Sequence, residues 1–202
     1  MFNLIRGVEE FKKIKVDRKL PLFCDTETCI EEGKSDGGLY GKIRLFQLFQ
    51  TGWERAIVID CFCVPLEQVL DLIQDSHCVF HGGAYDLHTI NLTTPGTWFP
   101  RKVDDTLYLS RLCFGEKTKF TFYDCLRYVG ESDELIEGID KKEAQKSDWS
   151  KNLTQKQKTY AAADVFYLEK LYNKVKKADT EMVYNLDIVN LKHAVSYCRN
   201  GM

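Results

Sequence analysis

Residues 20–28 read LPLFCDTET, an apolar run that ends in two acidic residues, Asp25 and Glu27. The apolar run predicts a buried central strand, and side chains two residues apart in a strand point to the same face, about 6–7 Å from each other. Two carboxylates that face the same way at the end of a buried strand repel each other unless a cation or a proton compensates. For this pair alone, a strand that ends in a solvated acidic loop is the more common explanation.

A third acidic residue lies on the core side of a late helix. A capping box predicts that this helix begins at Thr154 and continues to about Lys177. Asp164 follows Tyr160 by four residues, so both lie on the apolar stripe of the helix. A carboxylate on a core face needs a partner, which a buried salt bridge or a cap could supply. Alternatively, the helix packs against the first strand and brings the Asp164 carboxylate to Asp25 and Glu27.

A fourth acidic residue follows a short apolar strand. The stretch from His81 to Asp86 reads HGGAYD, in which a Gly-Gly turn leads into a helix. An Asp in the first turn of a helix commonly does no more than stabilise the helix dipole. The functional alternative is a carboxylate that reaches the same site from a strand–helix junction.

The remaining pattern predicts an α/β fold. Three strands joined by short links indicate an antiparallel meander, and short strands that alternate with helices follow it. We expect a mixed sheet of five strands flanked by helices, in a single domain over residues 1–202 with its core at about 20–177. The expected strands are 20–26, 42–50, 55–60, 77–81 and 102–104. The expected helices are 65–74, 85–91, 106–114, 122–129, 154–177 and a C-terminal helix at about 180–200.

Composition excludes several classes of protein. A length of 202 residues suits one domain with a substantial core, and the net charge of −2 gives no sign of a polyanion partner. The eight Cys include no Cys-x-x-Cys pair, which argues against structural zinc. The N-terminus lacks a secretory apolar core and no apolar run reaches membrane-spanning length, so we expect a cytoplasmic protein without membrane contact. Six lysines precede or begin the late helix, either as solvated surface or as a phosphate-binding rim: Lys141, Lys142, Lys146, Lys151, Lys156 and Lys158.

Taken in order, the motifs are Asp-x-Glu, an Asp after a strand and a Gly turn, and Tyr-x-x-x-Asp on a late helix. This pattern resembles the DEDD superfamily of 3′→5′ exonucleases, in the subgroup with Tyr in the last motif (DEDDy). It looks most like ribonuclease D-type enzymes and the proofreading domains of family A DNA polymerases. The resemblance covers residues 20–172 and is most specific over residues 139–171. One departure is His81-Gly82 where the family usually has His-Asn, which puts a contact near the scissile phosphate in doubt.

The resemblance implies a ribonuclease H-like fold and hydrolysis of the 3′-terminal phosphodiester of a single strand, with release of nucleoside 5′-monophosphates. It also implies two divalent cations, Mg²⁺ or Mn²⁺, as cofactors. Asp25, Glu27 and Asp164 would hold one cation, and Asp25 with Asp86 (through water) would hold the other. Tyr160 would orient the attacking water and relay its proton. The sequence does not identify the residues that bind the strand.

Our expectation of which nucleic acid the protein prefers rests on two further features of the sequence. Residues 184–202 are similar to the helix that follows the exonuclease domain in family A polymerases, although an ordinary amphipathic helix is an equal alternative. Ribonuclease D-type enzymes carry helical domains after the exonuclease domain, for which this chain has no room. We therefore expect single-stranded DNA rather than RNA as substrate, in a free-standing proofreading or repair activity, with a polymerase that lacks its own exonuclease as a possible partner. The rivals are an RNA-trimming enzyme and a catalytically silent nucleic-acid-binding module.

Overall fold

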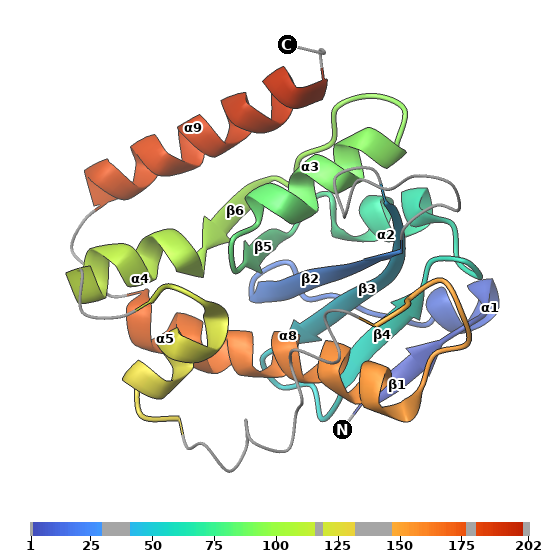
Figure 1. The fold of residues 1–202 in the computed structure, drawn as a ribbon. Helices are drawn as coiled ribbons and strands as arrows, with labels where there is room; N and C mark the ends of the chain where they lie inside the picture. The colour runs from blue at the N-terminus through green and yellow to red at the C-terminus, as the bar shows by residue number, and fades with distance from the viewer. Residues whose placement is uncertain (1, 30–40, 116–118, 132–146, 177–180, 200–202) are drawn as a thin grey trace.

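The computed structural model describes residues 2–29, 41–115, 119–131, 147–176 and 181–199, which form a mixed sheet covered by helices on both faces (Figure 1). The six strands run in the order β1-β4-β3-β2-β5-β6. Their bounds are β1 Phe2–Ile5, β2 Pro21–Cys29, β3 Lys42–Gln50, β4 Ala56–Asp60, β5 His77–Phe80 and β6 Lys102–Asp105. Strands β2, β3 and β4 form the expected antiparallel meander, whereas β5 and β6 continue the sheet in parallel with β2.

In the part of the chain that the structure describes, the sheet has one strand more than the five expected from the sequence. Strand β1 pairs in parallel with β4, with Phe2 opposite Ala56 and Ile5 opposite Ile59. It has four residues, of which only Ile5 is buried, so it has little apolar pattern of its own. Its strand conformation depends on a partner more than fifty residues away, which a reading of local patterns does not detect.

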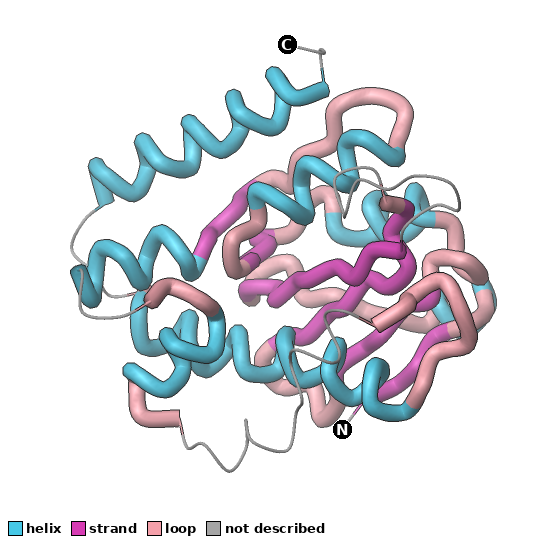
Figure 2. Tube along the Cα trace, viewed as in Figure 1, coloured by secondary structure: helices cyan, strands magenta, loops and turns pink. Residues whose placement is uncertain are grey.

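The helices form two layers around the sheet, as the tube view also shows (Figure 2). Helices α4, α5 and α8 share one apolar core with the sheet, and α1, α2, α3 and α9 share the other. Their bounds are α1 Val8–Phe11, α2 Leu66–Ile73, α3 Ala84–Thr93, α4 Thr106–Phe114, α5 Phe122–Tyr128, α8 Gln155–Val175 and α9 Glu181–Arg199. Within the described ranges, no helix is both long enough and apolar enough to span a membrane. The polar, weakly patterned sequence of residues 132–152 predicts mostly loop, and this stretch lies outside the described residues as far as residue 146.

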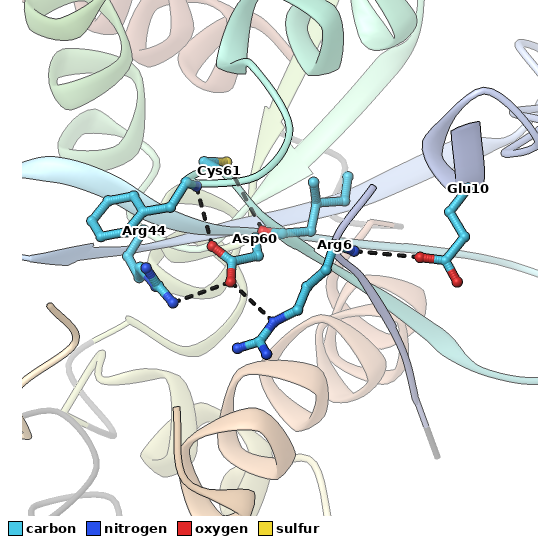
Figure 3. A network of polar contacts seen from close by, with 7 residues as sticks. Arg6, Glu10, Arg44, Asp60 and Cys61 are labelled. Carbon is cyan, nitrogen blue, oxygen red and sulfur yellow. Dashed lines mark hydrogen bonds and ion pairs between the residues drawn. The ribbon is translucent and has the colours of Figure 1, made fainter. Parts of the chain in front are cut away.

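Asp60, an acidic residue that ends an apolar strand, has a structural role. The carboxylate of Asp60 is buried at the end of β4, where Arg44 Nη2 lies 3.1 Å and Arg6 Nε 3.2 Å from Oδ2 (Figure 3). Its other oxygen accepts a hydrogen bond from the Phe62 N–H at 3.1 Å. These contacts join β3, β4 and the segment after β1, and they compensate the buried charge.

Candidate active site

The acidic pair lies on the face of β2 that is covered by α8. Strand β2 contributes Phe23 to the core on the α8 side, and Leu22 and Cys24 to the core on the α3 side. Asp25 and Glu27 follow Phe23 at intervals of two, so alternation turns both toward α8. The pairing of β2 with β3 shifts register after Glu27. The two carboxylates thus lie just before the point where the regular pairing of β2 with β3 is interrupted.

Helix α8 brings the third carboxylate to this pair. The helix begins with the predicted capping box, in which the Thr154 side chain accepts from the Gln157 N–H. The buried residues Ala161, Ala162 and Ala163 have no bulk beyond Cβ, which lets α8 lie close against the sheet. One carboxylate oxygen each of Asp25, Glu27 and Asp164 then lie within 4.8 Å of one another. The packing of helix on strand that the sequence suggested is therefore present.

The fourth carboxylate fills a gap between two strands. Strands β2 and β5 are paired only as far as Phe23 and Val79, and among the described residues the later backbone of β2 has no ladder partner on that side. The Asp86 Oδ1 atom accepts hydrogen bonds from the Thr26 N–H at 3.0 Å and from Thr26 Oγ1 at 2.7 Å. Asp86 is 4% exposed and does not belong to the cluster of three, but it lies beside it on the first turn of α3.

The Gly-Gly turn before Asp86 is held by an acidic residue of the next strand. The Asp105 carboxylate accepts from the N–H groups of Gly82 at 2.9 Å and Gly83 at 2.8 Å, and it also caps α4 through the Leu107 N–H. Gly82 has φ of 70°, a left-handed conformation that Asn also tolerates better than most residues. The departure from His-Asn at this position therefore leaves the backbone path into α3 compatible with the family motif.

Burial, together with the charges of neighbouring carboxylates, raises the pKa values of the acidic residues. Burial, followed by the charges of Asp86, Asp164 and Glu27, raises the pKa of Asp25 well above its usual value. Burial and the charges of Asp164 and Asp86 do the same for Glu27. Burial raises the pKa of Asp86 to about 6, against the opposing hydrogen bonds from Thr26. Such a site stores electrostatic repulsion that a bound cation would relieve.

Two tyrosines lie against the carboxylate cluster, of which the sequence identified one. Tyr160, one turn before Asp164, is buried, and burial together with the nearby carboxylates raises the pKa of its phenol. Tyr123 of α5 donates a hydrogen bond from its hydroxyl to Asp164 Oδ1 at 2.7 Å. Burial and the charge of Asp164 raise the pKa of Tyr123 as well. Sequence patterns gave no signal for Tyr123, because its contact depends on how α5 docks on α8.

All five predicted site residues line one cavity of about 470 Å³. Its volume falls in the range of small-molecule pockets. Aromatic side chains form much of the remaining wall, among them Tyr85, Phe120, Tyr123 and Trp149. Of the six lysines noted in the sequence, Lys141, Lys142 and Lys146 lie outside the described residues. Lys151 pairs with Asp148 on the surface at 3.0 Å.

The donor set in the cavity suits a hard divalent cation. Three carboxylates converge, and Mg²⁺ and Mn²⁺ prefer carboxylate oxygen to nitrogen or sulfur. Asp25, Glu27 and Asp164 could hold such a cation directly, and Asp86 stands beside them. This arrangement can bind a phosphodiester through cations and position a water against it.

Comparison with solved structures places the fold. NrnC of Brucella melitensis gives a TM-score of 0.71 at 22% identity, over 99% of this chain and 92% of that one. The RNase D–GMP complex of Trypanosoma brucei gives a TM-score of 0.75 at 15% identity, over 96% of this chain and 64% of that one. Escherichia coli RNase D gives a TM-score of 0.66 at 22% identity, over 98% of this chain and 49% of that one. These likenesses confirm the ribonuclease H-like mixed α/β fold that the motifs implied.

Comparison of sequences identifies the family. No curated protein sequence matches the chain. The family model described as 3′–5′ exonuclease matches residues 8–178, a span that contains the whole carboxylate cluster and both tyrosines. The chain therefore belongs to the 3′–5′ exonuclease family.

Proposed function

We propose that the protein is a DEDDy exonuclease that removes nucleoside 5′-monophosphates from the 3′ end of a single strand by two-cation catalysis. One observation carries this proposal: carboxylate oxygens of Asp25, Glu27 and Asp164 lie within 4.8 Å of one another inside a cavity. These residues come from separate parts of the sequence and are brought together by the packing of α8 on β2. A silent binding module would have no need to gather like charges at the expense of stability.

The resemblance to the DEDDy exonucleases suggests a role for each carboxylate. Asp25, Glu27 and Asp164 would hold one Mg²⁺ or Mn²⁺ ion, and Asp25 with Asp86 would hold a second. When bound, the cations would lower the pKa of a water and neutralise charge on the phosphodiester. By the same resemblance Asp86 would act through water, and the two hydrogen bonds that its Oδ1 atom accepts from Thr26 hold its carboxylate in place.

Tyr160 would orient the attacking water as a hydrogen-bonding phenol. The pKa of its hydroxyl lies above the ordinary value near 10, because burial and the charges of Asp164, Glu27 and Asp25 disfavour the phenolate. The hydroxyl therefore keeps its proton at neutral pH. It can fix the direction of a water molecule and relay a proton, but it does not act as a free base.

The cavity suits an unpaired strand end. A terminal nucleotide must leave its stack and its partner to reach the carboxylates, and aromatic walls replace the lost stacking. Tyr85 is 40% exposed at the cavity, whereas Trp149 is buried and Phe120 half-buried. Stacking on such side chains contributes roughly 1–3 kcal/mol per base and tolerates any base. Selectivity for single strands would follow from this geometry.

For the sugar there are two candidates. The sequence favoured DNA because of the polymerase-like tail, and that tail forms helix α9, which packs against α3, α4 and β6. RNA is the second candidate, because two of the solved relatives are named RNase D and one is described as an exoribonuclease. Another relative, Brucella melitensis NrnC, is described as bound to pGG. Matched DNA and RNA strands of one sequence, digested side by side, decide between them.

The test uses 5′-labelled single strands with Mg²⁺ or Mn²⁺, and with EDTA as the control. Stepwise shortening from the 3′ end and release of nucleoside 5′-monophosphates are expected, and EDTA should stop both. Asp25→Asn and Asp164→Asn should abolish turnover, whereas Asp75→Asn, which changes a surface carboxylate paired with Arg18, should not. Wild-type rates in both site variants would refute the assignment. Co-purification with a polymerase that lacks an exonuclease domain tests the proposed partner.

A further inference from the structure

Tyr123 is the one contact to the carboxylate cluster from α5, among the hydrogen bonds that join described residues. Its side chain is 4% exposed, and its hydroxyl donates to Asp164 Oδ1 at 2.7 Å. Helix α5 packs on α8, and the Thr121 side chain caps its start by accepting from the Asp124 N–H. The Tyr123 ring also packs edge-to-face on Phe122, with centroids 5.3 Å apart. The packing of α5 and of the Tyr123 ring thus holds the phenol in place independently of its hydrogen bond to Asp164.

A fixed donor matters here because the end of an Asp side chain turns easily. The last torsion of Asp is broad and roughly two-fold, so packing alone sets it poorly. The nearby carboxylates of Asp25 and Glu27 repel that of Asp164 and favour its rotation away from them. A neutral hydroxyl on Oδ1 opposes this rotation without adding a charge. Tyr160 belongs to the same helix as Asp164, whereas Tyr123 holds the carboxylate from a separate element.

We propose that Tyr123 is a positioning residue that orients the Asp164 carboxylate for cation binding. The inference rests on the cation site of the proposed function. Partners that hydrogen-bond to a metal ligand commonly change metal affinity or activity by about 10- to 100-fold when they are replaced. Tyr123 would act on catalysis only through Asp164, so its loss should be felt first in the binding of the cation.

The chain offers a closely matched control. The Tyr172 hydroxyl donates to Asp104 Oδ2, also at 2.7 Å, in a buried contact away from the cavity. Tyr123→Phe and Tyr172→Phe each remove one hydroxyl from a Tyr–Asp hydrogen bond and keep the ring. Asp104 keeps its contacts with His77 and Tyr184 when Tyr172 loses its hydroxyl, so the unfolding temperature serves to show that both variants fold. Only Tyr123→Phe should change the cation site.

The experiment titrates each protein with Mn²⁺ alone by calorimetry, and then measures nuclease rate against Mn²⁺ concentration. Tyr123→Phe should raise the dissociation constant for Mn²⁺ by about tenfold or more. Saturating Mn²⁺ should restore most of its rate, and Tyr172→Phe should match the wild type in both measurements. A Tyr123→Phe dissociation constant within twofold of the wild type would overturn the inference, even if the nuclease activity is as proposed. If no protein degrades a strand, the exonuclease assignment fails, and the Mn²⁺ titration still decides the role of Tyr123.

Discussion

The cation-free protein should lose stability as pH rises, in contrast to a protein whose acids have lowered pKa values. The pKa of Asp86 is raised from 3.8 to about 6, mainly by burial, so the folded state holds this proton more tightly than the unfolded chain. The stability from this proton is complete below pH 3.8 and is lost as pH passes through about 6. Asp25 and Glu27 have raised pKa values as well, and they act in the same direction.

The size of this loss follows from the shift of Asp86. About two pKa units correspond to about 3 kcal/mol over the full range, of which about 1–2 kcal/mol falls between pH 5 and pH 8. For a chain of this size, that lowers the unfolding temperature by about 2–8 °C. A cation at one hundred times its dissociation constant returns about 2.7 kcal/mol. Because protons compete with the cation, its stabilising effect should be larger at pH 8 than at pH 5.

Thermal unfolding in EDTA and in Mg²⁺, at pH 5 and pH 8, tests both statements. Other groups titrate in the same range, and Asp104 has a lowered pKa that works in the opposite direction, so the wild type needs a matched variant. In Asp86→Asn the amide oxygen can accept the same two hydrogen bonds from Thr26 without the charge. The wild type should lose more stability than this variant between pH 5 and pH 8 in EDTA. An equal or smaller loss, or an equal effect of Mg²⁺ at both pH values, would refute the reasoning.

Further substitutions test single contacts. Tyr160→Phe should lower kcat by about 10²-fold or more with little change in the dissociation constant for Mn²⁺, and full activity would remove this hydroxyl from the mechanism. Gly83→Ala should lower the free energy of unfolding by about 1–3 kcal/mol in a denaturant titration, because the added Cβ would lie 2.7 Å from the Phe80 Cβ. Gly7→Ala is the control, because its Cβ would have nothing within 4 Å, and its loss of unfolding free energy should be clearly smaller. Gly82→Asn should fold with at most a small loss and should increase kcat/KM, since it restores the family amide; a lower value would contradict this.

Local patterns were sufficient for most elements of the fold. Strand β3 occupies the predicted residues 42–50, and α8 begins at the predicted capping box because alternation and caps act between near neighbours. Strand β1 could not be predicted in this way, because it depends on its distant partner β4. The same distinction applies to the site. Asp25, Glu27 and Asp164 were found from periodicity, whereas Tyr123 meets Asp164 only through the docking of two helices.

Asp86 shows why two explanations of one residue need not compete. Its position in the first turn of α3 is the one that stabilises a helix dipole, which was the simpler interpretation of the sequence. The same position places its carboxylate where β2 and β5 separate, so that it accepts from the free Thr26 N–H. Asp105 stabilises this arrangement, because its carboxylate accepts a hydrogen bond from the Gly82 N–H in the turn before α3. The separation of β2 from β5 therefore also creates the backbone donor that holds Asp86 beside the other carboxylates.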